Sequence, residues 1–467
     1  MKPLSIAFHH FGCKVNFAEA SSLSRQFADK GYHLTNFHDR ADIYVISSCV
    51  VTATAEKKCR AAIRQAHALN PNAKIAVIGC FPELKANEVT KMEGVDIVLG
   101  HQGKFNLLQE IEGQGRRSGN QDRGVGAQST GHRAQGEEEQ IKDSLSWIPD
   151  HESPITYKSN IEHRTSKIPF VPSYSVGDRT RSFLKIQDGC DYHCSYCAIP
   201  LARGKSRSDT IAHILDEARE IVDSGVKEII LTGVNIGDFG KHNGETLIQL
   251  LTELEKEIRI PRIRISSIEP DLLHDEIIEL VSCSEKFLPH FHIPLQSGCN
   301  GTLRAMKRKY TTTLFSSRVE KIRATLPYAC IAADVIVGFP GESEADFQTT
   351  YSFLEQLSIS YMHVFTYSKR ENTLASKAFE MVPRSQMKER SDLLHHLSDV
   401  KKQLFYQSNK GRKSAVLFES DNKNGMMHGF TENYIKVKTT FDPSLVNEIR
   451  SVRLEKLDDD LCYEVMG

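Results

Sequence analysis

The 467-residue sequence has almost no net charge, since 59 lysines and arginines face 60 aspartates and glutamates, and it contains only one tryptophan. This composition does not demand a nucleic-acid partner, although a local basic surface would still allow one. Met1 to Phe8 contains no long apolar segment, and no apolar run reaches the roughly 18 residues of a membrane span. We therefore expect a cytoplasmic protein with no signal peptide and no membrane segment.

Cysteine is abundant by contrast, with eleven residues spread along the chain. An odd number of cysteines, several of them after strand-like runs, favours metal ligation in a reducing compartment over a framework of disulfides. The length of the chain allows two to four domains.

Three of the cysteines, Cys190, Cys194 and Cys197, are spaced C-x3-C-x2-C. This run cannot supply four thiolates to a tetrahedral zinc ion unless a ligand comes from elsewhere. It can hold three irons of a four-iron cluster and leave the fourth iron free for a small chelating molecule. A zinc site and three incidental cysteines are the alternatives, but no Cys or His follows at a zinc-finger spacing.

Strands and helices alternate in segment 1–112, which predicts a parallel sheet with crossover helices. The expected strands are 4–8, 43–46 and 75–78. Cys13, Cys49 and Cys80 each follow one of these strands. Because the carboxyl ends of parallel strands share one edge of the sheet, the three thiols should converge there and suit a second cluster with an open iron. The alternative is that each is an ordinary buried cysteine.

Segment 169–382 contains six strand-like runs separated by helices, which predicts a partial barrel of six βα repeats with its site at the carboxyl ends of the strands. The expected strands are 183–186, 228–231, 263–266, 291–293, 333–337 and 362–365. The C-x3-C-x2-C loop follows the first of them, where a barrel enzyme places its chemistry.

The other segments complete an α/β fold. Segment 113–168 is rich in Gly, Gln, Ser and charged residues and too poor in apolar residues for a core, so we expect a flexible linker or insertion. A connecting helix is expected over 383–411, and short β-like runs in 412–467 predict a small antiparallel β-barrel. The predicted order is thus a parallel α/β domain, a (βα)6 partial barrel and a small β-barrel.

The C-x3-C-x2-C loop, with Tyr196 before its last cysteine, resembles the signature of the radical S-adenosylmethionine (SAM) enzymes. The resemblance implies that Cys190, Cys194 and Cys197 hold a [4Fe-4S] cluster whose open iron chelates SAM. It also implies that one electron from this cluster splits SAM into methionine and a 5′-deoxyadenosyl radical, which abstracts a hydrogen atom from an unreactive carbon.

The three N-terminal cysteines resemble those of the methylthiotransferases, a branch of the radical SAM enzymes that carries an auxiliary cluster. The likeness implies that Cys13, Cys49 and Cys80 hold a second [4Fe-4S] cluster, which presents sulfur. Residues 12–19, Gly-Cys-Lys-Val-Asn-Phe-Ala-Glu, are similar to the branch that acts on threonylcarbamoyladenosine in tRNA. Segment 412–467 resembles the TRAM domain, an RNA-binding module, although its composition gives no independent support for RNA binding.

This likeness implies a tRNA methylthiotransferase that adds a 2-methylthio group to N6-threonylcarbamoyladenosine at position 37, with SAM as both methyl donor and radical source. The implied partners are ANN-decoding tRNA, an electron donor such as flavodoxin or ferredoxin, and a sulfur donor, and we expect a monomer. The alternatives are the same chemistry on isopentenyladenosine in tRNA or on an aspartate of a ribosomal protein, and a non-catalytic iron–sulfur protein that binds RNA.

Residues near the strand ends are expected to bind SAM. Arg203 would pair with the SAM carboxylate, for which a bidentate guanidinium is suited, and an exposed loop arginine is the alternative. The full expected set is Tyr196, Arg203, Gly233, Ser267, Glu269, Gln296, Val337 and Gly338. The basic stretch 306–310, which ends in a tyrosine, is expected either to contact RNA or to be a solvated helix end.

Overall fold

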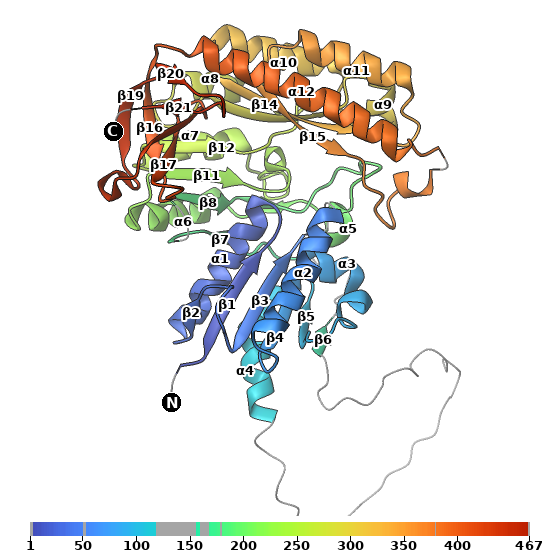
Figure 1. Cartoon of the computed structure of the whole chain (residues 1–467), viewed down its shortest axis with the longest axis vertical. Coiled ribbons are helices and arrows are strands. Elements are labelled where there is room, and N and C mark those ends of the chain that lie inside the picture. The colour runs from blue at the N-terminus through green and yellow to red at the C-terminus, as the bar shows by residue number, and fades with distance from the viewer. Residues whose placement is uncertain are drawn as a thin grey trace, which may run out of the picture.

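The computed structural model describes residues 3–49, 53–117, 156–158, 168–177, 180–378 and 380–465. These residues form an N-terminal α/β unit, a central curved sheet with helices outside it, and a C-terminal β unit beside that sheet (Figure 1). The expected α/β fold is confirmed. Most of the linker predicted over 113–168 lies outside the described residues.

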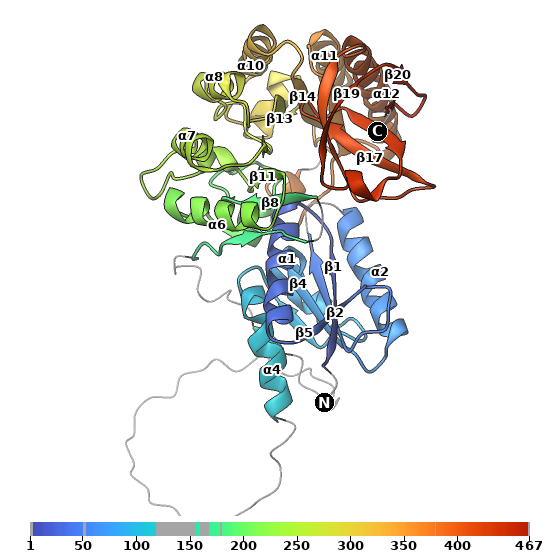
Figure 2. The ribbon, with the colours of Figure 1, turned by 90° about the vertical axis from the view of Figure 1, so that its left-hand side faces the viewer.

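The N-terminal sheet has six parallel strands in the order β2-β1-β3-β4-β5-β6. Their bounds are β1 (Ser5–His10), β2 (His33–Thr35), β3 (Ile43–Ser48), β4 (Lys74–Gly79), β5 (Ile97–Leu99) and β6 (Thr156–Lys158). The helices are α1 (Lys14–Asp29), α2 (Ala53–Leu69), α3 (Cys80–Val89) and α4 (Leu107–Arg117). Helices α1 and α2 cover opposite faces of the sheet (Figure 2). A strand covered on both faces is buried throughout, as β3 is, and its apolar side chains divide between two cores.

The central unit has six parallel strands, which pair as β8-β11-β12 and β13-β14-β15. Their bounds are β8 (Arg181–Lys185), β11 (Glu228–Thr232), β12 (Arg262–Ile265), β13 (His290–Gln296), β14 (Cys330–Val337) and β15 (Tyr361–Thr366). Isolated parallel bridges, Ile263 to Phe287 and Ser267 to His292, join the two halves. The short strand β7 (Ser173–Tyr174) pairs antiparallel with β8, and β9 (Gln187–Asp188) pairs with β10 (Arg207–Ser208).

Helices lie on the outer face of this curved sheet (Figure 1). They are α6 (Ile211–Asp223), α7 (Leu247–Glu257), α8 (Asp275–Cys283), α9 (Asn300–Ala305), α10 (Thr312–Thr325), α11 (Glu344–Gln356) and α12 (Arg384–Ser408). Helix α5 (Ile199–Arg203) lies instead beside α3 of the N-terminal unit, where Ala202 packs against Cys80 and Leu84. Helix α12 packs on β15, where Ser398 Oγ donates to the Met362 carbonyl oxygen (2.9 Å) and accepts from the Met362 N–H (3.0 Å). It therefore supplies the helix of the sixth βα repeat.

Alternation along each strand separates an apolar outer face from a polar inner face. On β13, Phe291 and Ile293 belong to the main hydrophobic core, whereas His290 and His292 occupy the alternate positions. The same alternation places the other polar inward positions, which are Arg181, Glu228, Arg262, Arg264, Asp334 and His363. The inside of the barrel is thus lined with charged and hydrogen-bonding groups before any ligand is considered.

The C-terminal unit is a curled six-stranded sheet in the order β19-β16-β17-β18-β21-β20. Its strands are β16 (Lys413–Phe418), β17 (Met426–Thr431), β18 (Lys436–Thr440), β19 (Ile449–Arg453), β20 (Lys456–Leu457) and β21 (Tyr463–Glu464). All pairs are antiparallel except β18 with β21, and the side chains inside the curl form a separate hydrophobic core.

The C-terminal unit is attached to the starting ends of the barrel strands. Arg262 donates to the carbonyl oxygens of Ala415 (3.3 Å), Phe430 (3.2 Å) and Thr431 (3.0 Å). Glu228 is fully buried and pairs with Arg262 and with Arg264. Burial opposes ionisation of Glu228, but the neighbouring arginines lower its pKa to about 2. This carboxylate therefore stays charged and holds the arginines in place.

Glu217 on α6 is expected to destabilise the fold at neutral pH. Burial raises its pKa to about 8, the nearby carboxylate of Asp209 acts in the same direction, and Oε2 has no hydrogen-bond partner among the described residues. Below the unfolded pKa of about 4.3 the group is protonated in both the folded and the unfolded state, and the fold has its full stability. That stability is lost as the pH rises through the folded pKa, because only the unfolded state ionises easily. Glu217→Gln should therefore raise the free energy of unfolding by on the order of 1–3 kcal/mol at pH 8.

The same variant should have little effect at pH 4, where Glu217 is protonated in both states. Urea denaturation at the two pH values measures this, with the exposed Glu276→Gln on α8 as the control. An equal gain at both pH values would contradict the assignment.

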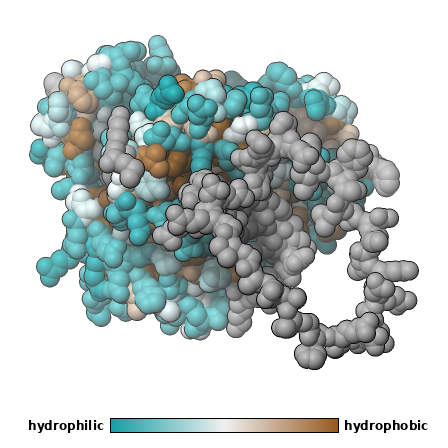
Figure 3. All heavy atoms as spheres, turned by 90° about the horizontal axis from the view of Figure 1, so that it is seen from below, coloured by the Kyte–Doolittle hydropathy of each residue, from teal (hydrophilic) through white to brown (hydrophobic). Residues whose placement is uncertain are grey.

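Within the residues the structure covers, no helix combines the length and apolar character that crossing a membrane requires. The face of the molecule seen from below is mainly hydrophilic, with apolar residues in small groups (Figure 3).

Candidate active site between two sets of cysteines

Cys13, Cys49 and Cys80, here called the first set, lie at the carboxyl edge of three neighbouring strands, β1, β3 and β4. Cys13 is the N-cap of α1, Cys80 opens α3, and Cys49 follows β3. Gly12 has φ +117° and approaches Cys49 so closely that a Cβ atom on Gly12 would lie 2.5 Å from the Cys49 Cβ atom. Asn16 Nδ2 donates to the carbonyl oxygen that ends β3 (3.0 Å). The sheet edge and these contacts bring the three thiols together.

Cys190, Cys194 and Cys197, the second set, lie in the loop between β9 and α5. The Tyr192 N–H points at Cys190 Sγ (3.4 Å) and the Ile199 N–H points at Cys197 Sγ (3.4 Å). Burial raises the pKa of Cys190 to about 11 and that of Cys197 to about 12. The backbone donors are placed to stabilise thiolates, which form when metal binding displaces the protons.

Among the described residues, neither set of cysteines has its three sulfur atoms all within 4.8 Å of one another. A tetrahedral zinc ion with bonds of about 2.3 Å would hold them roughly 3.8 Å apart. Neither set is therefore arranged as a zinc site, and a four-iron cluster on each set stays a prediction.

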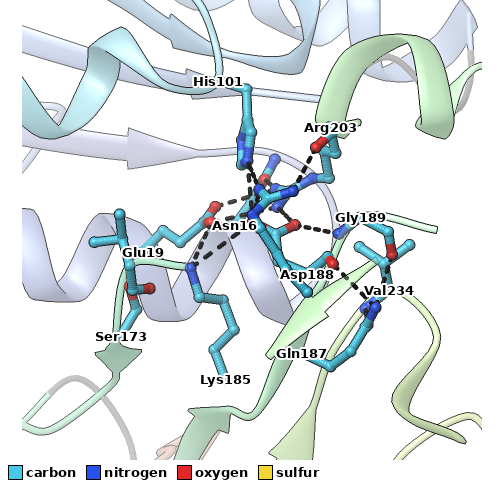
Figure 4. A network of polar contacts seen from close by, with 12 residues as sticks. Asn16, Glu19, His101, Ser173, Lys185, Gln187, Asp188, Gly189, Arg203 and Val234 are labelled. Atoms are coloured by element: carbon cyan, nitrogen blue, oxygen red, sulfur yellow. Dashed lines mark hydrogen bonds and ion pairs between the residues drawn. The ribbon is translucent and has the colours of Figure 1, made fainter. Parts of the chain in front are cut away.

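A buried network of charged side chains joins the N-terminal unit to the barrel beside the first set (Figure 4). Arg203, only 1% exposed, donates from Nη1 to Asp188 Oδ1 (2.8 Å) and from Nη2 to Glu19 Oε2 (3.0 Å). It also donates to the side-chain oxygen of Asn16 on α1. The Arg203 guanidinium, which we expected to bind SAM, therefore pairs with two carboxylates of the protein, and a SAM contact for Arg203 stays a prediction.

This network carries more positive than negative charge. Its carboxylates are Glu19 and Asp188, and the cations paired with them are Lys104, Lys185, Arg203 and Arg207. His101, bonded to Asp188 (3.0 Å), stays neutral because burial lowers its pKa to about 3. Burying cations without an equal number of anions costs free energy. The cation Arg203 acts electrostatically on Cys80 of the first set. An anionic centre held by the first set therefore fits its surroundings.

Arg308 is the residue of the second site that sequence reasoning missed. Its side chain is 3% exposed, donates from Nη1 to Cys194 Sγ (3.1 Å), and pairs with Glu269. Burial of Glu269 raises its pKa to about 7 in spite of this arginine. The basic stretch was expected to face RNA or solvent, and no spacing rule indicates that one of its members turns inward towards a cysteine over a hundred positions earlier.

Arg308→Met is expected to lower the reduction potential of a cluster bound at the second set. A cation beside Cys194 stabilises the reduced form, which carries one more negative charge. A redox titration followed by electron paramagnetic resonance measures the midpoint potential. The potential of Arg308→Lys should stay close to the wild-type value, because lysine keeps the positive charge. An unchanged potential in Arg308→Met would contradict this role.

The other expected SAM-binding residues divide between two environments. Ser267 Oγ lies 2.7 Å from His292 Nδ1 inside the barrel, and Glu269 lies beside Arg308. Tyr196 packs against Phe339 near the second set. Tyr196 and Glu269 thus lie at the cysteine loop, whereas Ser267 lies inside the barrel, and a SAM contact for each stays a prediction.

Gly233, Gln296, Val337 and Gly338 are placed differently. A Cβ atom on Gly233 would lie 3.0 Å from the carbonyl oxygen of Gln187, and Gln296 has φ 68° at the end of β13. Val337 is 1% exposed in the hydrophobic core, and a Cβ atom on Gly338 would lie 2.4 Å from Met387 of α12. Val337 and Gly338 therefore pack towards the helix layer, and their contact with SAM stays a prediction.

The start of α1 faces the inside of the barrel. Phe17 and Ala18 of α1 pack against Phe183 and Ile230 of β8 and β11. Beyond this contact His292, Asp334 and His363 lie together on inward positions, with His292 Nε2 2.7 Å from Asp334 Oδ1 and the His363 imidazole exposed. The part of the barrel interior that these three side chains line is here called the chamber. The first set of cysteines thus sits where the N-terminal unit meets the barrel, and the second set sits at the carboxyl end of the barrel strands.

Comparison with known proteins agrees with the division of the chain into an N-terminal unit and a barrel. Residues 5–100 match a family model described as the uncharacterized protein family UPF0004, and residues 184–354 match the radical SAM superfamily. A Bacillus subtilis protein named threonylcarbamoyladenosine tRNA methylthiotransferase MtaB is 36% identical over 97% of this chain and 94% of its own length. An Aquifex aeolicus protein of the same name is 36% identical over 93% of this chain and 96% of its own.

A Roseobacter denitrificans protein named tRNA-2-methylthio-N(6)-dimethylallyladenosine synthase is 29% identical over 97% of this chain and 96% of its own. Among solved structures, the radical SAM methyltransferase TsrM from Kitasatospora setae, with cobalamin and a [4Fe-4S] cluster, covers 80% of this chain and 77% of its own with a TM-score of 0.51 and 12% identity. That likeness concerns the fold.

Proposed function

Because this chain belongs to the radical SAM methylthiotransferase family, we propose that it adds a 2-methylthio group to N6-threonylcarbamoyladenosine at position 37 of tRNA, with SAM as methyl donor and radical source. The family expected from the cysteine spacing is thereby confirmed. The proposal is supported by one set of three cysteines that follows neighbouring strands of the N-terminal sheet and another in the loop after β9, in a chain whose relatives are named for this reaction.

The residues that would hold the cofactors are Cys190, Cys194 and Cys197 for the SAM-binding [4Fe-4S] cluster and Cys13, Cys49 and Cys80 for a second [4Fe-4S] cluster. When bound, these clusters supply the electron that cleaves SAM and the site from which sulfur is transferred. The chain itself contributes position and charge. Arg308 pairs with Glu269 beside Cys194, Gly12 and Asn16 hold the loops of the first set together, and the Arg203 network fixes one set relative to the other.

The remaining requirements follow from the reaction. SAM would contact residues of the expected set Tyr196, Arg203, Gly233, Ser267, Glu269, Gln296, Val337 and Gly338. The electron donor would be a flavodoxin or ferredoxin, sulfur would come from a separate donor, and the protein would act as a cytoplasmic monomer on ANN-decoding tRNA. The C-terminal β unit would hold the RNA, as its likeness to a TRAM domain suggests.

The experiment is anaerobic reconstitution followed by nucleoside analysis. The reconstituted protein should bind about eight irons. With SAM, a reductant and tRNA that carries N6-threonylcarbamoyladenosine, it should yield the 2-methylthio nucleoside, detected by mass spectrometry. Conversion of isopentenyladenosine tRNA instead would favour the function named for the Roseobacter denitrificans relative. Binding of about four irons without 5′-deoxyadenosine formation would overturn the two-cluster enzyme.

A further inference from the structure

Lys14, the first residue of α1, is a cation without an anionic partner. Its half-buried side chain has no carboxylate within 4.0 Å and no hydrogen-bond acceptor among the described residues. The cations on inward-facing barrel positions do have carboxylate partners, and these pairs are Arg181–Glu419, Lys185–Glu19, Arg262–Glu228 and Arg264–Glu228. Among these described cations, Lys14 is therefore the one without a carboxylate partner, and it is free to pair with a ligand.

The Lys14 ammonium group faces the inside of the barrel. Lys14 lies three and four positions before Phe17 and Ala18, so it shares the face of α1 that packs against Phe183 and Ile230 on inward positions of the barrel strands. Although Lys14 follows Cys13 in sequence, its side chain is thus on the side of α1 that faces the inside of the barrel.

In the described part of the chain, the carboxylates that act electrostatically on Lys14 are Asp334 and Glu228, and both have partners. Asp334 contacts His292 (2.7 Å), and Glu228 pairs with two barrel arginines. His290 is 7% exposed, and neither of its ring nitrogens has a hydrogen-bond partner among the described residues. Unpaired polar groups at such a place are costly unless a ligand or water satisfies them. The complementary ligand is a small anion that accepts hydrogen bonds.

We propose that Lys14 binds the carboxylate of the threonyl substituent on the target adenine and thereby selects a carboxylate-bearing base. The inference rests on the proposed function, because it names how that site recognises its substrate. The N6 substituent is attached at C6 of the same six-membered ring that contains C2. A carboxylate held by the residue after Cys13 would therefore keep C2 close to the first set of cysteines. A charge-assisted hydrogen bond of this kind predicts a preference of about tenfold to a hundredfold over an uncharged analogue.

The test uses synthetic anticodon stem-loop RNAs that carry either the threonylcarbamoyl group or its neutral carboxamide. Binding constants and kcat/KM are measured for the full-length reconstituted protein and for Lys14→Gln, Lys14→Arg and Lys30→Gln. Lys30 is exposed at the other end of α1 and serves as the matched control. Wild type, Lys14→Arg and Lys30→Gln should prefer the carboxylate RNA, and Lys14→Gln should bind and convert both RNAs alike.

Two results would overturn the inference. One is that Lys14→Gln keeps the preference. The other is that it loses affinity and turnover equally on both RNAs, which would assign Lys14 to the sulfur site or to the RNA backbone. Iron content shows whether the variant carries its clusters, and RNA binding gives a readout that does not depend on turnover. Failure of the proposed function has a separate signature, since wild-type protein would then convert neither threonylcarbamoyl RNA nor its carboxamide.

Discussion

Removing one cysteine from each set should divide the reaction into two halves. Cys194→Ala is expected to abolish 5′-deoxyadenosine formation, because the site that binds and reduces SAM would lose one of its three thiolates. Cys80→Ala is expected to retain SAM cleavage and to form no 2-methylthio nucleoside, because the sulfur site is the one disturbed. Each variant should bind about four irons, half of the wild-type content. Mass spectrometry of both products measures the two losses separately.

Cys283→Ala is the control for this pair, since Cys283 is exposed at the end of α8 and far in sequence from both sets. It should keep both products and the full iron content. Normal methylthio product from Cys80→Ala would show that the first set does not take part in the reaction.

Glu19→Gln is expected to lower the free energy of unfolding by about 3–5 kcal/mol. The Glu19 carboxylate accepts from Lys104 (2.5 Å), Lys185 (3.1 Å) and Arg203 (3.0 Å), and its removal leaves these cations buried with Asp188 as the remaining anion. Burial would raise the pKa of Glu19, but the cations lower it well below its ordinary value. Its stabilisation is therefore present above the ordinary pKa and is lost as the pH falls through the lower, folded one.

Denaturation at pH 7 and at pH 3 measures this effect, and the difference between variant and wild type should shrink at the lower pH. Glu112→Gln, at an exposed position of α4, is the control and should change stability by less than about 0.5 kcal/mol. A wild-type unfolding curve for Glu19→Gln at pH 7 would show that an anion from elsewhere already neutralises the network.

The elements that sequence could predict are those with a local pattern. Alternation of apolar strands and helices indicated the α/β sheet and the (βα)6 barrel, and the position of a cysteine after each strand indicated where Cys13, Cys49 and Cys80 lie. Helix α12 was expected as a connecting helix whose apolar stripe packs against the barrel, and the structure identifies β15 as the strand that it contacts. That partner could not be named from the sequence, because it is identified only in three dimensions.

Partners of charged side chains could not be predicted in this way. Arg203 pairs with Glu19, which is 184 positions away, and Arg308 reaches Cys194 over 114 positions. A bidentate guanidinium suits any carboxylate, so its residue type does not say which one it meets. Lys14 is informative for the opposite reason, since only the folded chain reveals that no described carboxylate lies within 4.0 Å of its ammonium group.

The bonds that attach the C-terminal β unit to the barrel run from Arg262 to main-chain carbonyl oxygens of Ala415, Phe430 and Thr431. Every residue type offers the same carbonyl group, so substitutions at these acceptor positions leave the attachment in place. Evolution can therefore alter the outer strands of this unit while the unit keeps its position on the barrel. Under the proposed function, such changes would alter which RNAs the unit prefers without moving the bound RNA relative to the catalytic residues.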